Sequence, residues 1–98
     1  MKITKSYYVY ILASQRNGTL YTGTTSNLLK RISEHKSGKY PGFTSQYNVT
    51  MLVHVEVFNN PVAAIRREKN IKAWKRHWKI QLIETNNPLW RDLYSEMI

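Results

Sequence analysis

The sequence predicts a fold of the α/β or α+β class, in which a small antiparallel sheet packs between helices in the order β-β-α-β-α-α. Three observations predict it: an aromatic and β-branched run over residues 7–12, apolar residues at helical spacing from Leu28, and a proline at position 61 that begins a second helical stretch. Since 98 residues can bury a single modest core, we expect residues 1–98 to form one domain.

A β-hairpin is predicted at the start of the chain. Residues 7–12 have the composition of a strand that is covered on both faces, and Asn17-Gly18 is a turn signal before the returning strand. A two-residue turn and a six-residue loop over residues 13–18 both place Tyr10 and Tyr21 on one face of the hairpin. Only the longer loop makes the two tyrosines direct neighbours.

The first predicted helix carries polar side chains beside an apolar stripe. Ser26 or Asn27 can cap it, Gly38 is placed to end it, and its apolar positions are Leu28, Leu29 and Ile32. Arg31 and His35 are four residues apart, so they stack on one face of this helix. A guanidinium and an imidazole placed in this way can clamp a phosphate, although each alone is typical of a solvated surface.

The middle of the chain predicts a loop, a third strand and a helix. Residues 39–46 have loop composition, and residues 48–58 are rich in valine and read as a strand. Pro61 suits the first turn of the helix that follows.

The helical pattern continues past a kink near Trp74 that no glycine or proline marks. The Asn-Asn-Pro sequence at 86–88 ends it, and residues 90–97 can form a short terminal helix.

Charge and composition limit the function classes. The chain has 15 basic and six acidic side chains, a net charge of +9 and no cysteine. This charge favours a polyanionic partner, above all nucleic acid, while an anionic membrane surface is a distant alternative. The longest apolar run, residues 7–13, is far shorter than the ~20 residues that span a bilayer. We see no signal peptide in residues 1–6, so a cytoplasmic protein is expected.

Glu68 is the only carboxylate between residues 61 and 82, where seven arginines and lysines occur. An acid would weaken a surface that only grips phosphates, but a carboxylate among cations suits a hard metal ion beside a phosphodiester. At 100° per residue, Glu68 lies at the edge of the helix side that carries Ala64 and Ile71. The alternative is an ordinary salt bridge with Lys72, which is worth ~0.2–0.5 kcal/mol.

Basic residues recur every three or four positions along these helices, and they can follow a phosphate backbone or simply form a solvated face. They are Arg66, Lys69, Lys72, Arg76 and Lys79. The three tryptophans can stack on bases of a single strand, although for Trp74 and Trp78 we expect core packing.

The ordered spacing of these residues resembles the GIY-YIG nuclease superfamily, especially its small single-domain members. The residues that carry the resemblance are Tyr8-Val9-Tyr10, Tyr21-Thr22-Gly23, Arg31, His35 and Glu68. The likeness runs from Tyr7 to the C-terminus. Tyr8 stands where the family name has glycine, and Thr22 where it has isoleucine; neither change replaces a reactive side chain.

The resemblance implies a three-stranded antiparallel sheet flanked by helices, and hydrolysis of phosphodiesters with one divalent ion, Mg²⁺ or Mn²⁺. Glu68 would hold that ion and Arg31 would stabilise the pentacovalent phosphate. By the same analogy Tyr10 or Tyr21 accepts the proton of the attacking water, and His35 assists. Because a phenol has a pKa of ~10, nearby cations must lower the tyrosine pKa for this role.

The resemblance also implies a late asparagine that orients the site, for which Asn87 is preferred to Asn86.

The charge of the chain and the resemblance together lead us to expect one of two functions. The first is a metal-dependent endonuclease with little sequence specificity, acting on DNA, with RNA as an alternative substrate. The second is a non-catalytic nucleic-acid-binding module on the same scaffold. The oligomeric state is left open.

Overall fold

The structure, a computed structural model, describes residues 5–40 and 42–98 and confirms the α+β fold with a three-stranded antiparallel sheet. The strands are β1 (Tyr7–Ala13), β2 (Leu20–Thr25) and β3 (Met51–Phe58), in the spatial order β2-β1-β3. The helices are α1 (Leu28–Ser37), α2 (Phe43–Gln46), α3 (Pro61–Ala73) and α4 (Arg76–Asn86), and a 3₁₀ helix, η1 (Leu93–Glu96), follows. Within the described residues, no helix has both the length and the apolar character needed to cross a bilayer.

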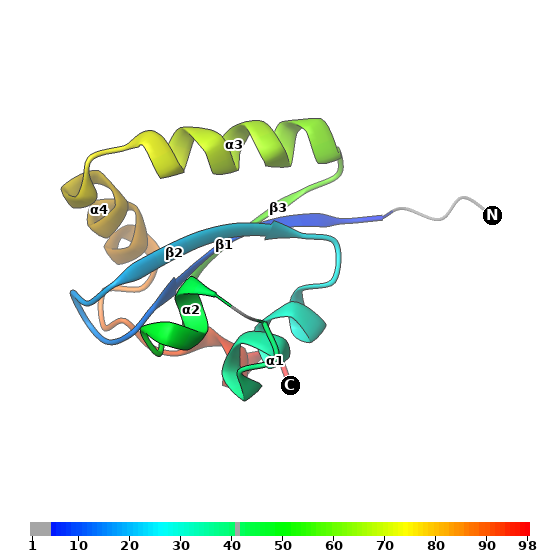
Figure 1. Ribbon diagram of the computed structural model, residues 1–98. Coiled ribbons are helices and arrows are strands. Elements are labelled where there is room, and N and C mark those ends of the chain that lie inside the picture. Colours follow the sequence, from blue (N-terminus) through cyan, green and yellow to red (C-terminus); the bar gives the residue numbers. More distant parts are fainter. Residues whose placement is uncertain (1–4, 41) are drawn as a thin grey trace.

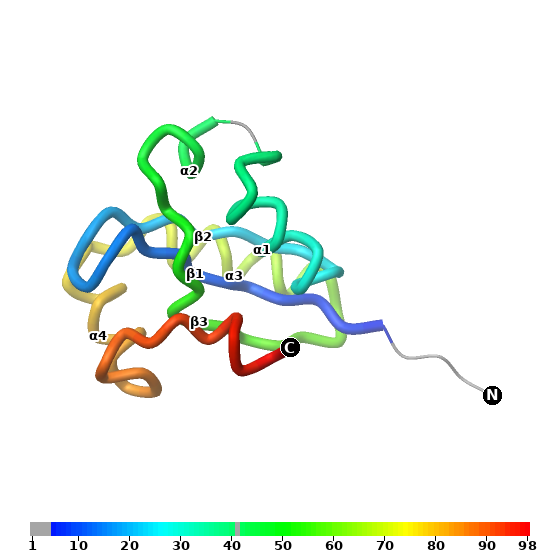
Figure 2. Tube along the Cα trace, turned by 90° about the horizontal axis from the view of Figure 1, so that it is seen from below, coloured from blue at the N-terminus to red at the C-terminus, as the bar shows by residue number. Residues whose placement is uncertain are grey.

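Helices cover both faces of the sheet, as Figure 1 shows, with α3 on one side and α1 and α2 on the other. The C-terminal segment runs beside β3 (Figure 2). The core follows these layers, because Val9 and Ile11 pack with α3 and α4, whereas Tyr10 and Leu12 pack with α1. Strand β1 is therefore buried on both faces, as its composition predicts.

The hairpin places Tyr10 and Tyr21 on one face, as predicted, but neither predicted register is correct. Tyr10 pairs with Gly23 and Tyr21 with Leu12, so the tyrosines are diagonal neighbours with ring centroids 6.3 Å apart. The loop covers residues 14–19, since the backbone N–H of Ser14 donates to the carbonyl of Thr19 at 3.0 Å. The Thr19 N–H donates in turn to Ser14 Oγ at 3.0 Å.

A contact from α4 also holds this loop. Arg76 Nη2 donates to the carbonyl oxygens of Asn17 and Gly18 at 2.7 and 2.5 Å. This contact joins residues almost sixty positions apart, so the local turn signal alone does not decide the register.

Helix α1 begins and ends as predicted, with Asn27 as its cap and Gly38 in the left-handed conformation at φ 77°. The prediction of a loop over residues 39–46 is wrong for its second half, which forms α2; Pro41 lies outside the described residues. The helix is held by tertiary packing, because the Phe43 ring stacks on Tyr21 at 6.3 Å.

The predicted kink near Trp74 is confirmed. Trp74 and Lys75 are extended, with ψ values of 152° and 148°, between α3 and α4. Trp74 packs against the core, and the Arg67 guanidinium lies 5.0 Å from its ring centroid. Side-chain packing therefore ends α3 where the sequence has no helix breaker.

An ion pair ties α3 to β3. Glu56 accepts hydrogen bonds from Arg67 Nε and Nη2 at 2.8 and 2.9 Å, and its Oε2 lies 2.8 Å from His54 Nε2. Burial opposes ionisation of this carboxyl, but the hydrogen bonds from His54 and Arg67 outweigh it and lower the pKa of Glu56 to about 2.

We expect Glu56→Gln to lower stability at pH 7 by about 1–3 kcal/mol, because it leaves Arg67 without its charged partner. Since the folded pKa lies below the ordinary value of 4.5, the ion pair stabilises fully above about pH 4.5 and is lost as pH falls towards 2. Urea unfolding at stepped pH should show the two proteins converging in this window. Glu96→Gln, at a surface pair with Arg91, is the control; a difference independent of pH would contradict the assignment.

Candidate functional site

Tyr10, Tyr21 and His35 meet between the sheet and α1. The Tyr10 hydroxyl lies 3.0 Å from His35 Nε2, and this hydrogen bond is buried. The His35 ring centroid is 5.8 Å from that of Tyr10 and 5.4 Å from that of Tyr21. Three of the predicted site residues, from β1, β2 and α1, therefore form one cluster.

Gly23 makes room for the Tyr10 hydroxyl. A Cβ at position 23 would lie 2.5 Å from the Tyr10 hydroxyl oxygen and 2.6 Å from Cζ, closer than atoms can approach. The two residues are direct partners across β1 and β2. Only glycine therefore lets the tyrosine lie over the backbone of β2 and reach His35.

Arg31 lies beside the cluster, held on several sides. Its guanidinium is 5.0 Å from the Tyr40 ring centroid, its Nε is 3.6 Å from Glu34 Oε1, and its Nη1 is 3.5 Å from the Thr24 carbonyl oxygen. The Arg31 guanidinium also acts on the Tyr10 hydroxyl, where its positive charge favours ionisation of the phenol. Burial lowers the pKa of Arg31, but these neighbours raise it on balance, so the side chain stays cationic.

Glu68 lies on α3, the helix on the other side of the sheet from α1, and forms the predicted salt bridge with Lys72. Its Oε2 lies 2.9 Å from Lys72 Nζ, and its side chain is 17% exposed. The carboxylate charge makes a small contribution to the raised pKa of both Tyr10 and Tyr21.

Burial controls the protonation of the cluster. It raises the pKa of Tyr10 to about 12, although Arg31 acts in the opposite direction, and it also raises the pKa of Tyr21. Burial, assisted by the charge of Arg31, lowers the pKa of His35 to about 4, so this ring is neutral at pH 7. In the protein alone, burial therefore outweighs the nearby cation, and the group next to the Tyr10 hydroxyl is a neutral imidazole.

Thr44 completes the cluster and was not predicted. It is buried in α2, and its Oγ1 lies 2.9 Å from His35 Nδ1, so both ring nitrogens of His35 have partners. With the proton on Nδ1, the ring donates to Thr44 and its Nε2 accepts from Tyr10; the other neutral tautomer reverses both bonds. A threonine in a predicted loop carries no signal of this role.

The structure does not bring Asn87 to this cluster. Its Nδ2 donates to the carbonyls of Val53 and Arg91 at 3.1 and 2.9 Å, and its Oδ1 accepts from the Arg91 N–H at 3.0 Å. Val53 belongs to β3, at the opposite edge of the sheet from β2. These bonds shape the chain before η1.

The predicted nucleic-acid-binding residues differ in their surroundings. Lys72 pairs with Glu68, Arg76 holds the hairpin loop, and Lys79 Nζ is 3.4 Å from the Lys72 carbonyl oxygen. Arg66 and Lys69 are exposed on α3.

The tryptophans also differ in burial. Trp90 is buried, and Trp74 packs against the core as predicted. The core-packing prediction for Trp78 is wrong, because its side chain is 48% exposed.

The donor set fits one hydrated divalent ion. In the part of the chain that the structure describes, no three His, Cys, Asp or Glu residues are grouped to hold a metal, so a closed site is absent there. Mg²⁺ is commonly held by one or two carboxylates and substrate phosphates while it keeps several waters. The single carboxylate of Glu68 suits that mode of binding.

A sheet that carries two tyrosines, next to an arginine and a histidine on one helix and a carboxylate on another, defines a domain of the GIY-YIG nuclease class. Residues 6–81 match the family described as the GIY-YIG catalytic domain. The chain belongs to the GIY-YIG family, a nuclease superfamily.

Relatives match most of the chain. The UPF0213 protein of Syntrophus aciditrophicus is 44% identical over 80 residues, 81% of this chain and 91% of the relative. The UPF0213 protein SH2523 of Staphylococcus haemolyticus is 40% identical over 78 residues, 80% of this chain and 94% of the relative. The solution NMR structure of the UPF0213 protein BH0048 from Bacillus halodurans has a TM-score of 0.56 at 32% identity, covering 89% of this chain and 92% of that one.

We expect Gly23→Ala to destabilise the protein by about 1–3 kcal/mol, because the added methyl group overlaps the Tyr10 ring. Thermal unfolding measures the change. Thr24→Ala alters the next residue of β2 without adding an atom beside Tyr10, and it should stay within about 0.5 kcal/mol of wild type. A Gly23→Ala protein with the wild-type melting temperature would refute the close approach.

We expect the His35 ring to remain neutral down to about pH 4. Its folded pKa lies below the ordinary 6.5, so its contribution to stability is present above about pH 6.5 and falls as pH decreases towards 4.

Thr44→Val should change the ¹⁵N shifts of the ring nitrogens of His35, whereas Thr44→Ser should retain them. Identical spectra for Thr44→Val and wild type would show that the Thr44 contact does not decide which ring nitrogen of His35 carries the proton.

Proposed function

We propose that this protein is a divalent-metal-dependent endonuclease that hydrolyses DNA phosphodiester bonds with little sequence specificity, using one domain over residues 1–98. Family membership supports phosphodiester chemistry. The observation that carries the proposal is the buried 3.0 Å contact of Tyr10 with neutral His35, beside cationic Arg31. We further propose that the enzyme works in the cytoplasm.

Arg31 binds the scissile phosphate in this proposal. A guanidinium offers several N–H donors to phosphate oxygens and can stabilise the charge of a pentacovalent phosphate. Its contacts with Tyr40 and Glu34 hold it in place before substrate arrives. Little reorganisation is then needed during the reaction.

Tyr10 takes the proton of the attacking water as its own proton passes to His35 Nε2. One O–H bond of water breaks and one forms on Tyr10, while the Tyr10 O–H bond breaks and an N–H bond forms on His35. This coupled transfer avoids a free phenolate, which the raised pKa of Tyr10 disfavours. A phosphate bound at Arg31 offsets the positive charge that helps to lower the pKa of His35.

The same contacts favour Tyr10 over Tyr21 as the base. Tyr21 meets the hydroxyl of Tyr40, which raises its pKa further after burial. Tyr10 alone of the two has a hydrogen bond to a neutral imidazole among the bonds of the described residues. Tyr21 packs against the His35 ring and helps to fix its orientation.

Glu68 would hold one Mg²⁺ or Mn²⁺ together with water and a phosphate oxygen. When bound, such an ion draws charge from the phosphate and so makes it a better electrophile. The basic residues of α3 and α4, namely Arg66, Lys69, Lys72, Arg76 and Lys79, would attract and guide the nucleic-acid backbone.

A second candidate function is a non-catalytic nucleic-acid-binding module. One observation favours it, because Lys72 Nζ occupies one oxygen of Glu68 at 2.9 Å. An enzyme must give up this salt bridge, at least in part, to bind a metal ion, whereas a binding module can keep it.

We expect cleavage of single- or double-stranded DNA in Mg²⁺ or Mn²⁺ and none in chelator. Glu68→Ala and Arg31→Ala should each lower the cleavage rate about 10²- to 10³-fold, because each removes a charge that acts on the reacting phosphate. Gel assays of labelled DNA measure the rate, and fluorescence anisotropy in chelator should show that binding persists. Lys30→Ala, which removes an exposed charge next to Arg31, should cleave at nearly the wild-type rate.

Two results would reject the enzyme and favour the binding module. One is binding without cleavage by wild type on any DNA or RNA substrate. The other is equal cleavage by wild type and Glu68→Ala, which would point to a contaminating nuclease.

A further inference from the structure

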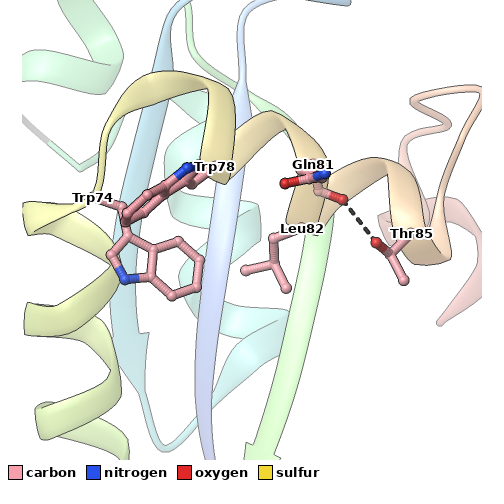
Figure 3. Close-up of a pocket in the computed structure, with 5 residues that line it drawn as sticks. All are labelled: Trp74, Trp78, Gln81, Leu82 and Thr85. Atoms are coloured by element: carbon pink, nitrogen blue, oxygen red, sulfur yellow. Dashed lines mark hydrogen bonds between the residues drawn. The ribbon is translucent and has the colours of Figure 1, made fainter.

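A pocket of about 390 Å³ lies where α3 meets α4, on the side of the sheet opposite α1. Its lining residues are Trp74, Trp78, Gln81, Leu82 and Thr85. Figure 3 shows both indole rings at one end, Leu82 in the middle, and the polar Gln81 and Thr85 towards the other end. The two tryptophan rings are T-shaped with centroids 6.4 Å apart, so the face of one ring is free of stacking by the other.

Trp78 is not used by the core of this chain. Its side chain is 48% exposed, whereas Trp90 is 2% exposed and donates from Nε1 to Glu84 at 2.7 Å. A half-exposed tryptophan in an apolar pocket is typical of a binding surface, because its removal from water upon binding is favourable.

The charge around the pocket favours an anionic occupant. Residues 69–83, which include both tryptophans, contain five lysines and arginines and no carboxylate. Lys75, Arg76 and Lys79 flank Trp78 in the sequence; Lys75 and Arg76 are exposed, and Lys79 is half-buried. A second copy of this chain carries +9 and would be repelled from such a surface.

We propose that this pocket binds a nucleobase, stacked on Trp78, of a nucleic-acid strand whose phosphates contact Lys75 and Lys79. Aromatic side chains that stack on bases, combined with cations along the backbone, are the usual means of binding an unpaired strand. Gln81 supplies an amide that can donate to or accept from the edge of the base.

The pocket lies on the same side of the sheet as α3, the helix that carries Glu68. Helix α3 ends at Ala73, about 7.5 Å along the helix axis from Glu68 at 1.5 Å per residue, and Trp74 follows directly. Lys72 lies between Glu68 and Trp74, and Lys79 Nζ is 3.4 Å from the Lys72 carbonyl oxygen. A strand that runs along α3 past Glu68 can thus place a base in the pocket. The inference rests on the proposed function only in taking nucleic acid as the ligand.

The test compares two probes in chelator, so that no cleavage is needed: a short labelled oligothymidine and an abasic strand of equal length. Wild type should bind the oligothymidine more tightly than the abasic strand, and only the oligothymidine should strongly quench tryptophan fluorescence. Trp78→Ala should weaken oligothymidine binding by about fivefold to a hundredfold, as expected for one lost stacking contact, and leave abasic-strand binding unchanged.

Two further variants keep the test independent of folding. Trp78→Phe retains a stacking ring and should bind the oligothymidine nearly as wild type does. Leu89→Ala removes an exposed apolar side chain outside the pocket and should change neither affinity. Circular dichroism verifies that each variant is folded.

Equal affinity of wild type for the two probes would overturn the proposal, as would unchanged oligothymidine binding by folded Trp78→Ala. It would also be overturned if sedimentation showed a wild-type dimer that Trp78→Ala dissociates, because the pocket would then be an interface between copies. If wild type shows no metal-dependent cleavage but still binds the oligothymidine more tightly than the abasic strand, the proposed nuclease activity is rejected and the proposed base-binding pocket is supported.

Discussion

The buried hydrogen bond between Tyr10 and His35 is the contact on which the arrangement of the site depends. It joins β1 to α1 inside the core, where an unpartnered hydroxyl or imidazole would be costly. Gly23 permits it by leaving space over β2, and Thr44 satisfies the second ring nitrogen. Sheet, helix α1 and helix α2 are thus positioned by one chain of polar contacts that must be complete to be stable.

Charge is divided between the two sides of this cluster. Arg31 keeps a cation next to Tyr10, while the charge of Glu68, the single acid of α3, acts on the same tyrosine from the other helix. Burial keeps Tyr10 and His35 uncharged between them. A phosphate oxygen and a hard cation are the ligands that complement such a pair of opposite charges, and the neutral groups between them can move a proton without first creating an ion.

Much of this arrangement was predictable because it depends on local patterns. Turn and cap residues located the hairpin and the ends of α1, and helical spacing placed Arg31, His35 and Glu68 beside the core. The remaining features depend on contacts between distant residues. Arg76 influences the hairpin register from α4, Phe43 packs α2 onto Tyr21, and the part of Thr44 is visible only once α2 lies over His35. The preference for Asn87 rested on resemblance, and its hydrogen bonds with β3 show a structural task.

The hydrogen bonds from Arg76 to the hairpin loop affect the order in which the chain folds. A nascent chain that has not yet added residue 76 has no guanidinium for the carbonyls of Asn17 and Gly18. Contacts of such long sequence range form late, since the entropy of closing a large loop must be offset first. The two tyrosines can therefore sample other pairings until α4 docks, so the Tyr10–Tyr21–His35 cluster takes its final geometry only when most of the chain is in place.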